Sequence, residues 1–293
     1  MEPDSKRRIA EARTAASDAL RTFLNDTNEE VLAAVLANPN LTESDACIML
    51  ERLDLPPSLL GAIAQYPSWR KNEGVRLRLA RHPHCPRRVA LSLLRQLFLF
   101  DLVEISLLPS APAEIRRVGE EIILQRLPHL PIGEKLTLAR RGTARVAGGI
   151  LGEGHPQAAS LALNNPFLNE AQVLRVLARI GVHERVIAAI AKHPRWSLEY
   201  DVRMALIRHP LAPLAAVLHF LPDITMRDLH ELSAAATLPK NLRTYIRREV
   251  ARRAGTSKLP GKAKIWFQIP MWLVYRERDK KKRPWLKQES GST

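Results

Sequence analysis

The sequence predicts an all-α protein built as an α-solenoid, a superhelical stack of short helix pairs. Three observations predict this class. Aromatic residues make up 5% of the chain although 46% of it is hydrophobic, whereas strands are enriched in aromatic and β-branched residues. Short apolar segments end repeatedly in a residue followed by proline, and much of the chain is written twice at an offset of 127 positions, as at Pro39 and Pro166.

The recurring proline dipeptides predict where helices end. Proline disfavours the helical conformation of the residue before it and cannot continue a helix. Start signals follow the stops: Thr42 and Asn169 can accept the first free amide hydrogens of a helix, and Pro86 and Pro213 stand where a helix can begin. The predicted stops are Asn38-Pro39, Tyr66-Pro67, His82-Pro83, Leu108-Pro109, Leu127-Pro128, His155-Pro156, Asn165-Pro166, His193-Pro194, His209-Pro210 and Leu221-Pro222.

Identical residues recur 127 positions apart, without a gap, from about Leu36 to Arg116. Such a run favours internal duplication. The identities include Asn38 and Asn165, Trp69 and Trp196, Arg76 and Arg203, Arg81 and Arg208, His82 and His209, Asp101 and Asp228, Glu104 and Glu231, and Arg116 and Arg243.

The duplication divides the chain into five parts. Residues 1–27 are expected to cap one end of the stack, with one amphipathic helix over residues 6–24, because a terminal repeat has no neighbour to cover it. The first solenoid half is then 28–127, a helical connector that continues the stack is 128–157, and the second half is 158–253. Residues 254–293 form a basic tail that contains three of the five tryptophans.

The net charge of +15 suits an acidic partner or serves solubility. Ten Lys and Arg residues against three Asp and Glu give the tail +7 of this charge. Neither a signal-peptide core nor a spanning segment is evident, so a cytoplasmic protein is expected. Cys47 and Cys85 fit no disulfide or zinc spacing, and neither a metal site nor a cofactor is predicted.

The Asn-Pro and His-Pro turns, the Val-Arg pairs near helix starts and the short paired helices resemble the leucine-rich repeat variant and HEAT-like families of bacterial α-solenoids. The resemblance covers roughly residues 30–250. It implies a right-handed stack of short helices used mostly for binding. The cysteine cluster that holds iron and sulfur in some variant-repeat proteins is missing from this chain, and the motifs of HEAT-like DNA glycosylases are not matched.

Arg76 and Arg203 fall inside an apolar arc of their predicted helices, so their guanidinium groups need a partner. Unpaired burial would cost several kcal/mol. A structural ladder of ion pairs and contact with a ligand are both open. Arg116 and Arg243 belong to the same structural set, and helix-terminal carbonyls are alternative partners. The acids that recur at the offset of 127 are Glu43, Glu170, Asp101, Asp228, Glu104 and Glu231.

Three further groups are candidate binding residues, each with a structural alternative. Arg81, His82, Arg208 and His209 either satisfy helix ends or line one rim as an anion-contacting ridge. Trp69 and Trp196 either pack between repeats or stack on nucleic-acid bases. The basic run Lys280, Lys281, Lys282 and Arg283 binds an anionic membrane or nucleic acid, or stays solvated while residues 265–275 cap the last repeat.

The sequence therefore favours a non-enzymatic interaction module that binds a protein or peptide partner through its inner face or rim. A nucleic-acid-binding solenoid is the alternative, since the pI is about 10.4. A HEAT-like DNA-repair glycosylase is a third hypothesis. It requires a pocket that gathers a carboxylate with aromatic rings.

Overall fold

The computed structural model describes residues 3–67, 69 and 71–255. In this part of the chain it contains 18 α-helices and no strand, which confirms the predicted all-α class. The chain divides into two compact units, Met1–Phe220 and Leu221–Thr293. No helix among the described residues has the length and apolar character to cross a membrane.

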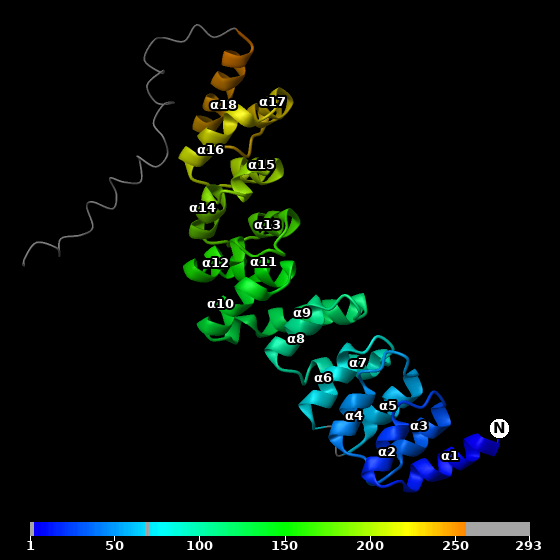
Figure 1. The fold of residues 1–293 in the computed structure, drawn as a ribbon. Coiled ribbons are helices and arrows are strands. Elements are labelled where there is room, and N and C mark those ends of the chain that lie inside the picture. The colour runs from blue at the N-terminus through cyan, green and yellow to red at the C-terminus, as the bar shows by residue number, and fades with distance from the viewer. Residues whose placement is uncertain (1–2, 68, 70, 256–293) are drawn as a thin grey trace, which may run out of the picture. The chain divides into compact units, whose positions relative to one another are not determined.

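The first unit consists of sixteen short helices joined by tight turns (Figure 1). They are α1 Pro3–Thr14, α2 Ser17–Phe23, α3 Glu29–Leu36, α4 Glu43–Met49, α5 Pro57–Gln65, α6 Glu73–Arg81, α7 Arg87–Leu94, α8 Leu99–Leu107, α9 Ala113–Arg126, α10 Ile132–Arg141, α11 Ala144–Glu153, α12 Pro156–Leu163, α13 Glu170–Leu177, α14 Glu184–Lys192, α15 Tyr200–Arg208 and α16 Leu214–Phe220, with 3-10 turns η1 Leu127–His129 and η2 Trp196–Leu198.

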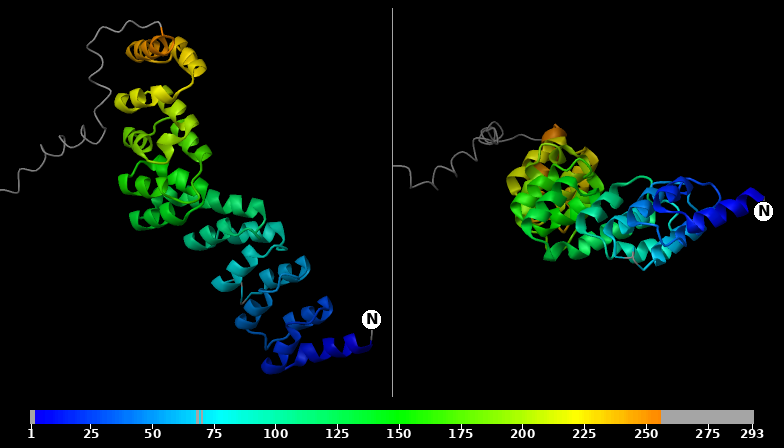
Figure 2. Two further views of the ribbon diagram at one scale, coloured as in Figure 1. Left: turned by 45° about the horizontal axis from the view of Figure 1, so that its top comes forward. Right: turned by 60° about the horizontal axis from the view of Figure 1, so that its bottom comes forward.

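The helices of the first unit lie in two rows. The main contacts join helices that are one or two places apart in the chain. One row contains the odd-numbered helices, with α9 in contact with α7 and α11, and the other row contains the even-numbered helices, with α6 in contact with α4 and α8 (Figure 1). Figure 2 shows the same succession along the chain from two further sides.

The second unit contains η3 Leu221–Asp223, α17 Met226–Ala234 and α18 Lys240–Arg253. Helices α17 and α18 pack side by side, and α18 also contacts η3. Leu229, Leu232, Leu242 and Ile246 are buried where the two helices meet. The tail from residue 256 onward, with the basic run 280–283 and the aromatic cluster 265–275, lies outside the described residues.

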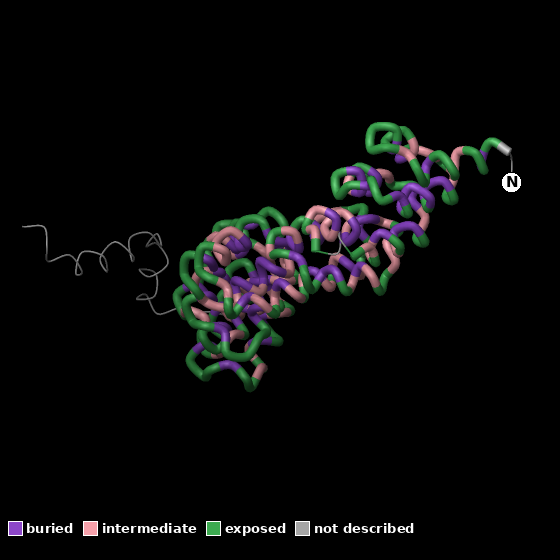
Figure 3. Tube along the Cα trace, turned by 90° about the horizontal axis from the view of Figure 1, so that it is seen from below, coloured by how far each residue is buried: buried purple, intermediate pink, exposed green. Residues whose placement is uncertain are grey.

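Apolar residues are buried where the helices face one another (Figure 3). The first unit thus has a core that runs along its rows, as amphipathic helices of this length require. In the connector, η1, α10 and α11 confirm the expected helical structure of residues 128–157. Leu138, Ala139 and Val146 are fully buried there.

The expected single helix over residues 6–24 is wrong. α1 ends at Thr14, and Ala16 is extended, with φ −69° and ψ 160°, before α2 begins at Ser17. The break leaves carbonyl groups at the end of α1 without intrahelical partners. Asn38 from the next repeat donates to the Ala12 and Ala15 carbonyls at 2.8 and 3.0 Å, so a tertiary contact stabilises the break.

Most of the predicted proline stops are confirmed. α6 and α15 end at Arg81 and Arg208, and the residue that follows each, before proline, is extended. The stop at His155-Pro156 is wrong, because Pro156 is the first residue of α12. The preceding helix ends instead at Gly154, whose φ of 84° is left-handed, a conformation that glycine adopts at little cost.

Two buried asparagines, Asn38 and Asn165, are equivalent in their contacts. They are 0% and 1% exposed. Asn165 donates to the Ala139 and Gly142 carbonyls at 2.9 and 3.0 Å, and its side-chain oxygen accepts from the backbone N–H of Phe167 at 2.7 Å. Each asparagine therefore satisfies the carboxyl end of an earlier helix and the turn that follows its own helix.

We expect Asn165→Ala to lower the free energy of unfolding by about 2–3 kcal/mol, because it leaves two carbonyls and one amide in the interior without partners. Urea unfolding monitored by circular dichroism measures this loss. Asn164→Ala is the matched control, since the exposed Asn164 side chain donates to a carbonyl within its own helix, at Ser160. A loss as large in the control as at Asn165 would contradict the assigned role.

Candidate binding surfaces

His82 was a candidate for an exposed anion-binding ridge, and the structure corrects that expectation. Its side chain is buried, 3% exposed. The His84 backbone N–H donates to Nδ1 at 3.2 Å, so Nε2 carries the proton and donates to the Arg52 carbonyl at 2.8 Å. Burial lowers the pKa of His82, while its bond to Arg52 opposes this shift. His82 is a neutral tie between repeats.

The other members of the expected ridge have different environments. Arg81 pairs with Glu104, with Nη1 and Oε1 3.2 Å apart. His209 is half-buried and accepts the Leu211 backbone N–H at 3.1 Å, and burial lowers its pKa. Arg208 is exposed. A continuous ridge of solvent-facing Arg-His pairs is therefore absent from this part of the structure.

Trp69 and Trp196 are each 1% exposed, so neither ring is available to stack on a nucleobase. The Trp196 indole N–H donates to the Leu163 carbonyl at 2.9 Å. The Trp69 ring stacks on Tyr66 with centroids 4.1 Å apart. Both tryptophans therefore pack between repeats, and their assignment as binding residues is wrong.

The arginine ladder takes a different form from the one predicted. Arg203 donates from Nε to the Ser197 carbonyl at 2.6 Å, so a backbone group at the end of η2 meets it. Its guanidinium carbon lies 5.7 Å from the centroid of the Phe220 ring. Glu104, a predicted partner of the buried arginines, pairs with Arg81 instead.

The remaining members of the ladder do not form a row of ion pairs among the described residues. Arg76, Arg116 and Arg243 each bury an Nε atom that has no hydrogen-bond partner there. Burial raises the pKa of Asp101, and nearby Arg76 opposes that shift. Asp228 accepts from the Thr225 hydroxyl at the start of α17, at 2.7 Å, and Glu231 is exposed.

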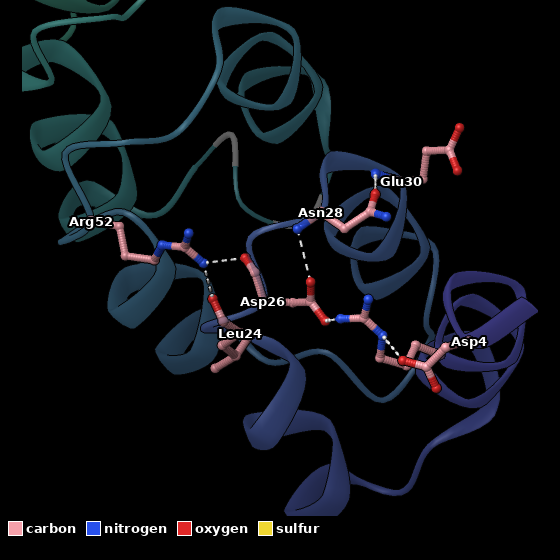
Figure 4. A network of polar contacts seen from close by, with 7 residues as sticks. Asp4, Leu24, Asp26, Asn28, Glu30 and Arg52 are labelled. Atoms are coloured by element: carbon pink, nitrogen blue, oxygen red, sulfur yellow. Dashed lines mark hydrogen bonds and ion pairs between the residues drawn. The ribbon is translucent and has the colours of Figure 1, made fainter. Parts of the chain in front are cut away.

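A recurring arginine contact was missed by sequence reasoning. Arg52 donates to the Leu24 and Asp26 carbonyls at 2.7 and 2.8 Å, beyond the end of α2 (Figure 4). Arg126 donates to the Leu97 and Arg95 carbonyls. Arg253 does the same to the Ile224 and Leu221 carbonyls. The available signal was an arginine at the end of α9 and again at the end of α18.

The first of these contacts belongs to a wider network near the amino terminus. Arg8 pairs with Asp26 at 2.6 Å and with Asp4 at 3.4 Å. The other Asp26 carboxylate oxygen accepts the backbone N–H of Asn28, and Asn28 caps α3 through the N–H of Glu30 (Figure 4). This network fixes the turn between α2 and α3, and it leaves the Asp26 carboxylate fully engaged.

An open depression of about 350 Å³ lies between α4 and α6. Ile48 is 46% exposed on α4. Two carboxylates flank it: Glu43 accepts from the Asn72 side chain, and Glu51 lies 3.7 Å from Arg78. The lining residues are Glu43, Ser44, Cys47, Ile48, Glu51, Asn72 and Arg78.

A second depression is lined by Ala64, Gln65, Val89, Ser92, Leu93 and Gln96, without a carboxylate. Neither depression is lined by an aromatic ring. No group of three His, Cys, Asp or Glu residues that could hold a metal ion occurs among the described residues. The candidate basic residues Lys280, Lys281, Lys282 and Arg283 lie outside the described part of the chain.

No protein-family model, curated protein or solved structure matches the chain. The resemblance to leucine-rich repeat variant and HEAT-like families stays a prediction.

Replacing Arg203 with Ala should lower the free energy of unfolding by about 1–3 kcal/mol, because it removes a charge-assisted bond to a carbonyl and the contact with Phe220. Thermal and urea unfolding would measure the loss. Arg175→Ala is the control, because Arg175 is exposed on α13 and surface substitutions usually change stability by under about 0.5 kcal/mol. Equal stability of Arg203→Ala and the parent would refute the structural role.

Stability should fall as the pH is lowered from about 7.5 to about 5.5. The pKa of His82 is lower in the folded chain than in the unfolded chain, so below the unfolded value the unfolded chain binds more protons. His82→Gln should therefore show a smaller loss over this range in urea unfolding. His193 and His209, whose pKa values burial also lowers, leave a residual dependence. An unchanged pH dependence would contradict the assignment.

Proposed function

We propose that the chain is a non-enzymatic α-solenoid interaction module, formed by internal duplication, that binds a protein or peptide partner. The observation that carries the proposal is the use of the candidate polar groups. The described side chains with the strongest sequence signals, such as His82, Trp196 and Arg203, contact backbone carbonyls of the fold. What this leaves for a partner is the outer surface of the helices.

Helix bounds support the duplication. α5 Pro57–Gln65 and α14 Glu184–Lys192 have bounds 127 residues apart, as do α9 Ala113–Arg126 and α18 Lys240–Arg253. Hydrogen bonds support it as well, since Asn38 reaches residues 12 and 15 and Asn165 reaches 139 and 142. Contacts confined mainly to neighbouring helices are typical of solenoids, in which each repeat touches the next.

The depression between α4 and α6 is the proposed partner surface. Its exposed Ile48 offers an apolar contact, and Glu43 and Glu51 place negative charge beside it. Residues 25–75 hold eight acidic and three basic residues, a net charge of −5 in a chain of +15. A peptide that carries an apolar side chain next to Lys or Arg complements this surface.

The alternatives receive less support. Nucleic-acid binding through the Arg-His turns needs exposed cations, but His82 is buried and Arg81 is paired with Glu104. A repair glycosylase needs a pocket that combines a carboxylate with aromatic rings, and neither depression described above has that lining. We therefore favour a binding module over both.

A peptide-display library selected against the full chain should enrich an apolar residue adjacent to Lys or Arg. Affinities of the selected peptides, measured by calorimetry, should fall at least about tenfold in Ile48→Asp, since truncation or charging of a central contact residue commonly costs 1–2 kcal/mol or about that. Ile180→Asp is the matched control, because Ile180 is 98% exposed beyond α13.

Two outcomes would sink the proposal. One is a selection that enriches no sequence. The other is a set of peptides whose affinities are the same for Ile48→Asp, Ile180→Asp and the parent, with circular dichroism showing that all three chains are folded.

A further inference from the structure

Helix α18 carries far more positive charge than its counterpart in the first copy. It has six basic residues and one acid, a net charge of +5, whereas α9 has three of each and is neutral. Both helices are 14 residues long. At the offset of 127, Arg247 and Arg248 take the places of Glu120 and Glu121. Packing of this helix type therefore does not require the arginines.

The extra cations lie on the solvent side of α18. Leu242, Ile246 and Glu249 are buried, and at about 100° per residue they define one side of the helix. Arg247 and Arg248 fall on the other side and are exposed. Lys240, one turn or more earlier, is exposed as well.

The acid of α18 is already neutralised. Glu249 accepts from Arg252 at 2.6 and 2.8 Å and from Arg253 at 2.7 Å. Lys240, Arg247 and Arg248 form no ion pair with any other residue that the structure describes. Their charge is therefore available to a ligand.

An aromatic ring lies beside these cations. Tyr245 is 42% exposed, and the guanidinium carbon of Arg248 lies 5.8 Å from the ring centroid. A ring of this kind can stack on a base, and a neighbouring guanidinium can contact its phosphate.

We propose that Lys240, Tyr245, Arg247 and Arg248 form a surface, the α18 face, that binds the backbone of single-stranded nucleic acid. Arginine supplies five of the six cations, and its planar group contacts phosphate in two places. The helix spans about 21 Å, which accommodates several phosphates of one strand. The sequence that follows, residues 254–293, carries a further +7.

The surroundings of the α18 face disfavour other polyanionic surfaces. An interfacial membrane helix buries an apolar face in the lipid, but the apolar side of α18 packs against α17. A specific protein interface has a buried apolar centre, and Tyr245 is the largest apolar group exposed on this helix. The α18 face is separate from the α4–α6 depression, so this inference goes beyond the proposed function.

Fluorescence anisotropy with the full chain and a labelled mixed-sequence 20-nucleotide RNA tests the inference. Arg247→Glu/Arg248→Glu, which introduces the residues of α9, should weaken binding at least about tenfold at roughly 100 mM salt and reduce the salt slope by about 1.4, or about 0.7 per lost contact. Tyr245→Ala should weaken RNA binding about tenfold and leave binding of a duplex DNA of the same sequence nearly unchanged.

Arg88→Glu/Arg117→Glu is the control for net charge, since both residues are exposed and lie near helix starts. It should change affinity less than about threefold. Three results would overturn the inference: parental RNA affinity in Arg247→Glu/Arg248→Glu, an equal loss in the control, or tighter binding of a polyglutamate peptide than of RNA. Ile48→Asp should leave RNA affinity unchanged, which separates this result from the peptide test.

Circular dichroism verifies that each variant is folded. If the double charge reversal unfolds the chain, Arg247→Gln/Arg248→Gln removes the same two cations without adding acids. It should weaken RNA binding as well, by about fivefold. Unchanged affinity in this variant would also reject the α18 face.

Discussion

The ends of short helices are the constraint on which this structure depends. Its helices are 7 to 14 residues long, and every helix leaves about four carbonyl groups at its carboxyl end without intrahelical partners. In helices this short, such groups are a large share of the backbone. Side chains of the next repeat satisfy many of them, as Asn38 does beyond α1, Arg52 beyond α2 and Arg126 beyond α7.

This arrangement joins local and tertiary structure. A side chain that caps the preceding repeat also fixes the distance and orientation between the two repeats, so the apolar faces of neighbouring helices are brought into contact. His82 shows the principle with a titratable group: its buried, neutral ring bonds Arg52 of the repeat before it. Because these polar groups are occupied inside the fold, the chemistry available to a partner lies on outward-facing helix surfaces.

The two copies diverge where the fold places no demand. Asn165 repeats the contacts of Asn38, whereas Arg247 and Arg248 replace the glutamates of α9. The row assignment adds a second difference. The offset of 127 corresponds to nine helices, from α3 to α12, an odd number, so α4 lies in the even row and its counterpart α13 in the odd row of the first unit. Equivalent surfaces of the two copies therefore belong to different rows.

The sequence by itself determined the helical class, most helix ends and the positions that recur 127 residues apart, because proline geometry and apolar spacing act within a few residues. It also identified Asn38, Trp196 and Arg203 as repeated positions. The partner of each was decided by tertiary structure: Arg203 meets the Ser197 carbonyl, and Glu104 pairs with Arg81. Sequence spacing could not reveal this, since a hydrogen bond between repeats depends on how neighbouring helices pack. The same packing buried Trp69 and His82 and left Ile48 and Arg248 on the surface.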